Sequence, residues 1–392
     1  MDISDIIPKD GKPQRIYCNK CNTHTEIAYD EFNQVVSGVA IRIQGLPVLR
    51  CPECGHDQLP DRSRFAIVQM HREACERSLT SMSTVRRKPS ERFDFTDVPF
   101  MYDTDDYSYF PGLYRPFDVG YLQPVFFRRR VLFKYDNAPG YKLKFASTTY
   151  GQIDTEDTYI SFGINRHGHV VMWLGDIAKL PKEEQYYLCS ENIDSDHALG
   201  SEFYDGQIEV VFTPLAKEDE LFRLRSNFLN KGFERFGVAL GHLEAETFDL
   251  ALSFNPPVID TSKERRHVVD TLNKIYLESL DNTALQRIVD HLGTRSSGSG
   301  SLKRLQAILQ ALAPNNDVSS LMTPLYVLYD LRVVYSHLTS DSGSTRLADA
   351  LKHLGLEASA SLSAIYGKLL DGLIECFEGM TKIIADNYHN DQ

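Results

Sequence analysis

The stretch LRVVYSHL, residues 331–338, places an arginine and a histidine in a strongly apolar run. The longer segment TPLYVLYDLRVVYSHL is apolar on nearly every side at helical spacing, which is typical of a helix at the centre of a bundle or shared with a partner. Thr323 is its expected N-cap, with Pro324 in the first turn. On a regular helix, Arg332 and His337 point about 140° apart. They can act together only near a helix end or across a dimer axis.

Helical patterns continue on both sides of this run. ERRHVVDTLNKIYLESL has apolar residues at helical spacing and begins after Asp260 or Thr261, either of which can cap it. NTALQRIVDHLG ends at Gly293, a residue type that favours the position after a helix. Residues 258–392 are therefore predicted to form an all-α bundle.

An R-x4-H motif at the end of an apolar helix, in an all-α domain of this size, resembles the HEPN superfamily, and LRVVYSHL looks like the motif of its ApeA-like, defence-related members. The resemblance covers roughly residues 260–392. It implies a metal-independent endoribonuclease that dimerises so that two motifs face each other, with Arg332 stabilising the phosphate and His337 as acid or base. Val333 departs from the family pattern, in which the residue after the arginine is usually polar. This departure leaves an inactive, structural HEPN module as an alternative.

Four of the seven cysteines lie in two CxxC pairs near the N-terminus, at Cys18, Cys21, Cys51 and Cys54. The chain begins without the apolar core of a signal peptide, so these pairs predict metal binding and not a disulfide framework. Four thiolates bind Zn²⁺ tetrahedrally and leave no open position, which predicts a structural zinc ion. His24 and His56 are close enough in sequence to be alternative ligands.

The segment between the two pairs alternates as a β-strand does, with Val39, Ile41 and Ile43 on one side. Residues 1–61 are therefore predicted to be a zinc ribbon. Paired knuckles and the approach LPVLRCPECG resemble the zinc ribbon of YgiT/MqsA-type antitoxins over about residues 15–60. No complete helix-turn-helix follows, so the DNA binding of that family is not implied. Residues 62–91 are expected to be a helix and a basic linker.

Residues 92–257 are predicted to form a central, mostly antiparallel β domain with one or two helices at its end. Strand-like runs such as PVFFRRRVLFKY, YKLKFAST, TYISFGI, HVVMWLG and QIEVVFTPL alternate with turn signals. The segment Glu191–Glu202 is rich in carboxylates and contains His197, which suggests either a capped acidic loop or a divalent-cation site.

The net charge of −12 argues against general coating of nucleic acids. Residues 91–261 carry this whole net charge, and the two ends of the chain are close to neutral. The charge of the ends therefore permits RNA binding. No apolar run reaches the length of a membrane span. We expect a cytoplasmic protein with no membrane partner.

These patterns together predict a multidomain α+β protein with a zinc ribbon, a β-rich centre and an HEPN-like helical bundle. The expected function is RNA cleavage in anti-phage defence or abortive infection. The expected form is a homodimer or higher oligomer that responds to a phage-derived or small-molecule trigger. One alternative is a non-enzymatic zinc-ribbon regulator, antitoxin-like, that binds nucleic acid or protein and dimerises through its helices. A metal-dependent enzyme at Asp194, His197 and Glu202 is another.

Overall fold

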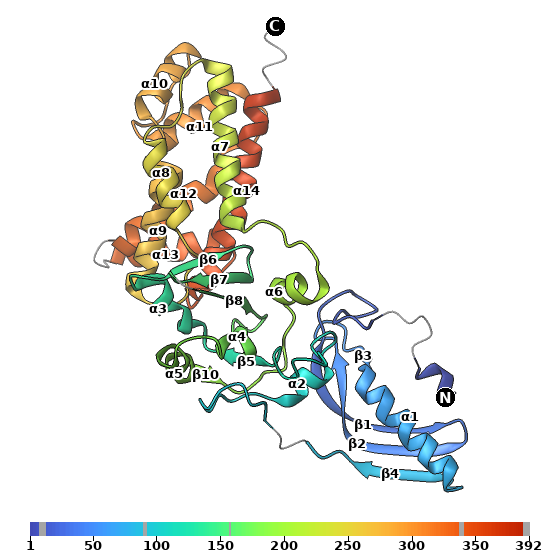
Figure 1. Cartoon of the computed structure of the whole chain (residues 1–392). Coiled ribbons are helices and arrows are strands. Elements are labelled where there is room, and N and C mark those ends of the chain that lie inside the picture. The colour runs from blue at the N-terminus through green and yellow to red at the C-terminus, as the bar shows by residue number, and fades with distance from the viewer. Residues whose placement is uncertain (8–12, 89–91, 157, 337–340, 387–392) are drawn as a thin grey trace. The chain divides into compact units, whose positions relative to one another are not determined.

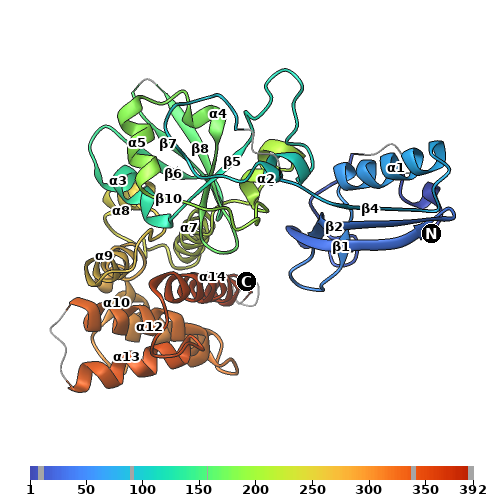
Figure 2. The ribbon, with the colours of Figure 1, turned by 90° about the horizontal axis from the view of Figure 1, so that it is seen from below.

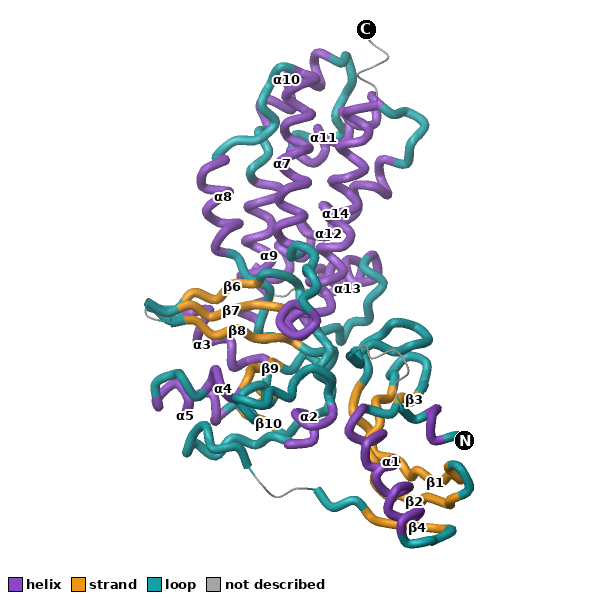
Figure 3. Tube along the Cα trace, turned by 45° about the vertical axis from the view of Figure 1, so that its right-hand side comes forward, coloured by secondary structure: helices purple, strands orange, loops and turns teal. Residues whose placement is uncertain are grey.

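The computed structural model describes residues 1–7, 13–88, 92–156, 158–336 and 341–386. The chain forms two compact units, Met1–Pro214 and Leu215–Gln392. The first contains the strands and several helices, and the second contains helices and loops only within its described part (Figure 1, Figure 3). The mixed fold with a C-terminal helical region is as predicted. The division falls at residues 214–215, so the helices expected at the end of the central region belong to the helical unit.

The N-terminal sheet is built on a long antiparallel hairpin. Its strands are β1 (Glu26–Val36), β2 (Val39–Arg50), β3 (Asp57–Gln58) and β4 (Ser81–Val85). β2 pairs antiparallel with β1 and β3, and in parallel with β4. β4 lies in the segment that the sequence predicted to be a linker. That prediction missed the strand because the five residues SMSTV are too few to show a period of their own and are ordered by pairing with β2.

The alternating pattern along β2 places its apolar residues on one buried face, as predicted. Val39, Ile41 and Ile43 are buried while the residues between them are exposed. Helix α1 (Asp61–Glu76) packs on this sheet (Figure 2). Its Ile67 is part of the apolar core that the helix and the sheet share. The predicted helix is therefore confirmed, and it gives the N-terminal sheet an apolar core beyond the cysteine site.

The second sheet of this unit has six strands in the order β10-β5-β9-β8-β7-β6, and all neighbours are antiparallel, as predicted. The strands are β5 (Pro124–Phe127), β6 (Lys142–Phe145), β7 (Tyr150–Asp154), β8 (Tyr159–Ile164), β9 (Val170–Trp173) and β10 (Asn192–Ile193). The shorter helical segments are η1 (Ile3–Asp5), α2 (Thr104–Tyr109), η2 (Arg129–Val131), α3 (Leu132–Asn137), α4 (Leu174–Ile177), α5 (Lys182–Ser190), α6 (Glu202–Tyr204) and η3 (Asp205–Glu209).

Two of the strand-like runs fold differently. PVFFRRRVLFKY is a strand only as far as Phe127 and then continues into η2 and α3. QIEVVFTPL contains no strand, since η3 covers its start and Val210 takes a left-handed φ of 54°. Phe212 is fully exposed. A strand needs a pairing partner as well as an apolar pattern, and this run has none in the described chain.

The C-terminal unit is a bundle of helices. They are α7 (Lys217–Phe236), α8 (Glu244–Ser253), α9 (Ser262–Asn273) with its extension η4 (Lys274–Glu278), α10 (Asn282–His291), α11 (Ser301–Leu312), α12 (Val318–Ser336), α13 (Asp341–His353) and α14 (Leu362–Asp386). α7 and α14 lie side by side, and α12 packs against α9, α11, α13 and α14 (Figure 1). α12 is therefore the central helix that its apolar sequence predicts.

The helix ends follow local sequence at some positions only. Thr261 caps α9 by accepting from the Glu264 N–H at 3.1 Å, and Gly293 follows α10 with a φ of 63°, both as predicted. The predicted start of α12 is wrong, because the helix begins at Val318 and Pro324 lies inside it. Asp317 provides the earlier cap by accepting from the Ser320 N–H at 3.0 Å.

Candidate functional site

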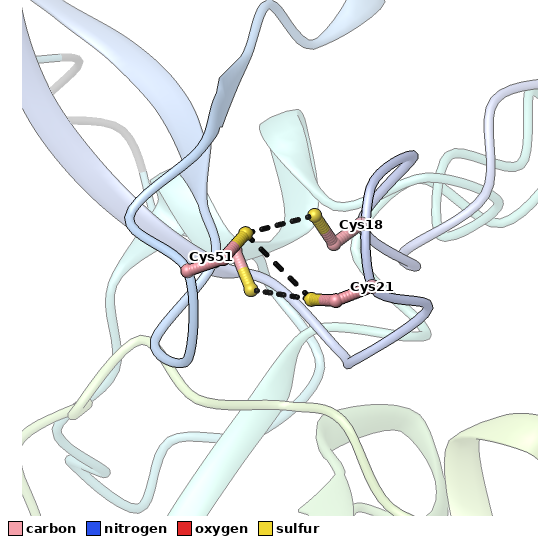
Figure 4. Close-up of side chains that lie close together, drawn as sticks. Cys18, Cys21 and Cys51 are labelled. Atoms are coloured by element: carbon pink, nitrogen blue, oxygen red, sulfur yellow. Dashed lines mark hydrogen bonds between the residues drawn. The ribbon is translucent and has the colours of Figure 1, made fainter.

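The two CxxC pairs meet in one cluster of sulfur atoms. The four Sγ atoms lie within 4.8 Å of one another, with 3.3 Å between Cys21 and Cys51 and 3.6 Å between Cys18 and Cys54 (Figure 4). Sulfurs bound tetrahedrally at ~2.3 Å from Zn²⁺ are about 3.8 Å apart. Disulfide sulfurs are only about 2.05 Å apart. The geometry therefore fits four thiolates around one metal ion.

Both knuckles have the same backbone turn. In each, the N–H of the first cysteine donates to the carbonyl five residues later, and its carbonyl accepts from the N–H four residues later. Asn22 and Gly55 complete the two turns with φ values of 58° and 66°, in the left-handed region that asparagine and glycine tolerate best. The local sequence alone therefore explains how each knuckle forms.

The cluster has a buried side and an exposed side. Cys18 and Cys51 are buried, whereas Cys21 and Cys54 reach the surface. Hydrogen bonding with Thr23 lowers the pKa of the Cys21 thiol to about 6. At neutral pH this side chain is therefore a thiolate, the form that binds metal ions.

The neighbouring histidines are not part of the cluster. Among the described residues, the group with metal-ligand spacing consists of the four cysteines, without His24 or His56. His24 Nε2 lies 2.9 Å from Asp205 Oδ1, and the Tyr17 hydroxyl donates to the same oxygen at 2.6 Å. Asp205 thus connects the first knuckle to η3, and this connection holds His24 in a different role.

The acidic segment around Glu191–Glu202 does not form one site. Its side chains contact separate partners: Glu191 contacts Arg130, Asp196 contacts His169 and Asn165, His197 contacts Asp106, and Glu202 contacts Ser147 and Thr149. Within the described chain, the four cysteines are the group whose ligand atoms lie close enough together to hold a metal ion. Asp194, His197 and Glu202 are therefore not brought together as a metal-dependent enzyme would require.

Asp106 and His197 form a buried pair that sequence reasoning missed. The Asp106 side chain is inaccessible to solvent, and its Oδ1 lies 2.8 Å from His197 Nδ1. Its Oδ2 has no hydrogen-bond partner in the described residues. Burial raises the pKa of Asp106. Burial alone would lower the pKa of His197, but the hydrogen bond to Asp106 and the charges of Asp106 and Asp103 together outweigh it, and the pKa is raised.

The basic residues of the predicted linker contact the same acidic helix. Arg86 forms an ion pair with Asp105, and Lys88 forms one with Asp103. The Tyr29 hydroxyl donates to Asp105 at 2.8 Å. These two cations therefore neutralise Asp105 of α2 and its N-cap residue Asp103. The acidic sequence DTDD at residues 103–106 is the local signal that could have indicated these contacts.

Arg332 lies on α12 with loose electrostatic partners. Its Nε is 3.6 Å from Asp270 Oδ1, and a terminal nitrogen is 3.8 Å from Glu278 Oε1. Both distances exceed those of hydrogen bonds, and the buried Nε has no hydrogen-bond partner in the described chain. Val333 beside it is half-buried. The guanidinium is therefore held by charge but not saturated by hydrogen bonds.

The last described turn of α12 is anchored to α9. The Ser336 hydroxyl donates to Asp270 at 2.8 Å, and Arg266 donates to the Tyr335 carbonyl at 3.3 Å. Arg265 donates to the Tyr335 hydroxyl at 3.2 Å. These bonds fix the point from which the chain continues to the predicted catalytic His337, which lies outside the described residues.

A cavity of about 510 Å³ opens beside Arg332. Its walls come from α12, from η4 and from the start of α11, and they include Tyr329 and Lys303. No local signal in the sequence could have placed these residues together, because the three segments meet only in the folded bundle. The cavity is an open hollow with both apolar and charged sides.

In the described part of the chain, no helix has both the length and the apolar character needed to cross a membrane. The sequence matches no protein family model, no curated protein and no solved structure.

Proposed function

We propose that this protein is a metal-independent endoribonuclease of the HEPN type that acts in anti-phage defence or abortive infection. Arg332 holds the scissile phosphate, and His337 acts as acid or base. One observation carries the proposal: the Arg332 guanidinium borders an open cavity and donates no hydrogen bond within the described chain.

Two other arginines of the bundle have the hydrogen bonding expected of a structural arginine. Arg225 is almost fully buried and donates to Glu244 at 2.9 and 3.1 Å and to Ser279 at 2.9 Å. Arg265 donates to Asp260 at 2.6 and 2.8 Å and to two further oxygens. The terminal nitrogens of both arginines donate to oxygen atoms, and the Nε of Arg225 is the one guanidinium nitrogen in these two side chains without a partner in the described chain. The terminal nitrogens of Arg332 make no such hydrogen bond there, so Arg332 is better suited to bind a ligand.

The residue types suit cleavage of RNA without a metal. The RNA 2′-hydroxyl loses its proton to a base, its oxygen attacks the adjacent phosphorus, and the bond from phosphorus to the 5′-oxygen breaks. An acid then protonates the departing 5′-oxygen. Histidine serves either step because it titrates near neutral pH, and arginine stabilises the charge that builds on the phosphate.

A homodimer would solve the geometric problem of the motif. Positions five residues apart diverge by about 140° on a helix, so one regular helix does not aim both side chains at one phosphate. In a dimer, Arg332 of one protomer and His337 of its partner can share a cleft. The anchored turn at Tyr335 and Ser336 would keep both protomers in the same arrangement.

The N-terminal unit would serve this activity without taking part in the chemistry. We propose that its cysteine cluster holds one structural Zn²⁺, because four cysteine ligands leave no open coordination position. The unit would present RNA or recognise a phage-derived or small-molecule trigger.

The test is cleavage of single-stranded RNA by the purified full-length protein in EDTA. The wild type should give a 2′,3′-cyclic phosphate and a 5′-hydroxyl, and RNA with a 2′-deoxy sugar at the cleaved position should resist. Arg332→Ala and His337→Ala should each lose at least about 100-fold in rate. Arg287→Ala and His291→Ala, on the exposed face of α10, are matched controls that should keep wild-type activity.

Two accompanying measurements make the result decisive. Zinc content is determined in the same sample, because a chelator can also withdraw the metal from the cysteines. Melting temperature is measured for Arg332→Ala, which should stay near wild type because it loses no hydrogen bond of the described chain. Equal cleavage by all variants contradicts the proposal. No cleavage by any of them, together with tight binding to a nucleic acid or protein, favours the non-enzymatic regulator.

A further inference from the structure

The cavity beside Arg332 combines positive charge with an exposed aromatic ring. Lys303 lies on its α11 wall, with Nζ 4.8 Å from the centre of the Tyr326 ring. Tyr329 on α12 is 46% exposed and borders the same space. Lys303 covers Tyr326, so Tyr329 is the ring whose surface is left available to a ligand.

The N-terminus of α11 adds to the positive electrostatic potential of the cavity. Gly300 is the N-cap and has no side chain to accept from the first N–H groups of this 12-residue helix. These groups and the helix dipole favour an anion. Lys303 and Arg332 border the same cavity, so its lining contains several groups that favour a phosphate.

The cavity lining also contains negative charge, which comes from two carboxylates. Glu278 accepts from the Asn273 amide at 2.7 Å and lies 3.8 Å from Arg332, and Asp330 lies 3.6 Å from Arg346. Each is thereby held in place, and each borders the cavity with further acceptor capacity. A ligand that carries both a phosphate and an amino group would suit both the cations and the carboxylates of this lining.

We propose that this cavity is a subsite for one nucleotide of single-stranded RNA, with its phosphate at Arg332, Lys303 and the start of α11 and its base stacked on Tyr329. Glu278 and Asp330 accept from the exocyclic amino group, so cytosine and adenine are preferred over uracil. The volume of about 510 Å³ lies within the range of small-molecule sites. Its role as an RNA subsite rests on the proposed ribonuclease function, and it adds the preference for a base.

The test measures binding of cytidine, adenosine and uridine 5′-monophosphates to the full-length protein by calorimetry. Inorganic phosphate and ribose 5-phosphate are the reference ligands. Cytidine and adenosine monophosphates should bind more tightly than uridine monophosphate, and all nucleotides more tightly than phosphate. Tyr329→Ala should weaken nucleotide binding about tenfold and leave phosphate binding unchanged.

Further variants separate the parts of the site. Lys303→Gln should weaken every phosphate-bearing ligand, and Asp330→Asn should narrow the difference between cytidine and uridine monophosphates. Lys352→Gln on α13 and Phe248→Ala on α8 are exposed controls that should change nothing.

The outcomes distinguish this inference from the function on which it rests. If Arg332 and His337 are needed for RNA cleavage but Tyr329→Ala changes neither nucleotide affinity nor base preference, the subsite is overturned and the ribonuclease stands. If the nucleotides bind as expected but the wild type cleaves no RNA, the cavity is a nucleotide site and the ribonuclease is overturned. Equal affinity for phosphate and all nucleotides also overturns the subsite.

Discussion

At the scale of single residues, the Asp106–His197 pair shows how burial and pairing act against each other. An inaccessible carboxyl group without a partner for its second oxygen favours its neutral form, and His197 restores part of the stabilisation of the charged form. The backbone carbonyl of His197 also accepts from the Ile27 N–H at 3.1 Å. The pair therefore lies where β1 meets the segment that follows β10.

This pair predicts a pH dependence of stability. The folded-state pKa of His197 is raised above the ordinary value of 6.5, so its stabilising contribution is complete below that pH and is lost as pH rises through the folded-state pKa. Asp103 raises this pKa further and Lys88 lowers it. Asp106→Asn should bring the pKa of His197 down and flatten the pH profile of the unfolding free energy.

The measurement is an NMR titration of the His197 ring in both proteins, with urea unfolding at several pH values. An unchanged His197 pKa in Asp106→Asn would show that the pair does not control it.

At the scale of elements, short-range features could be predicted and long-range ones could not. The two knuckles, the alternation of Val39 and Ile41, and the cap at Thr261 depend on residues close in sequence. β4 and the absence of a strand after η3 depend on whether a pairing partner is present. The sequence contains no local sign of that partner.

The candidate site follows the same rule. The four cysteines were predictable because each CxxC pair forms its own turn. The cavity could not be predicted, because Lys303, Glu278 and Tyr329 come from three segments. Only the packing of these segments decides how far apart the three side chains lie. Arg332 was found only through its motif, and its loose contacts are visible only in the folded bundle.

The cysteine cluster predicts the effect of removing one ligand. For the zinc site proposed above, Cys51→Ser should reduce the zinc content from about one ion per chain to near none and should destabilise the N-terminal sheet, because Cys51 directly follows β2. Elemental analysis and thermal unfolding followed by circular dichroism measure both effects. Cys75→Ser is the matched control, since Cys75 is exposed on α1 and lies outside the cluster. Wild-type zinc content in Cys51→Ser would refute this assignment.

At the scale of the whole molecule, the chain consists of two units with separate cores. The junction at Pro214–Leu215 adjoins a run of exposed apolar residues that includes Val210 and Phe212. Exposed chain outside regular structure is where proteases cut first. The apolar residues of the helical unit form one continuous core of their own.

Limited digestion with chymotrypsin should therefore cut after Phe212 early and release a helical fragment that stays folded. Mass spectrometry identifies the cut, and circular dichroism of the purified fragment should show a cooperative, helix-rich unfolding transition. Phe212→Gly should remove this cut and leave cleavage after Phe117, another exposed phenylalanine, unchanged. Early cuts within α7 or α14 would be inconsistent with a compact helical unit.

The position of the junction also bears on how the gene can evolve by recombination. A crossover in the codons for residues 210–215 would interrupt neither the sheet core nor the helical core. Each half could therefore be inherited, exchanged or replaced without rebuilding the other. Recombination at this place would join the same helical half to a new N-terminal half in a single step.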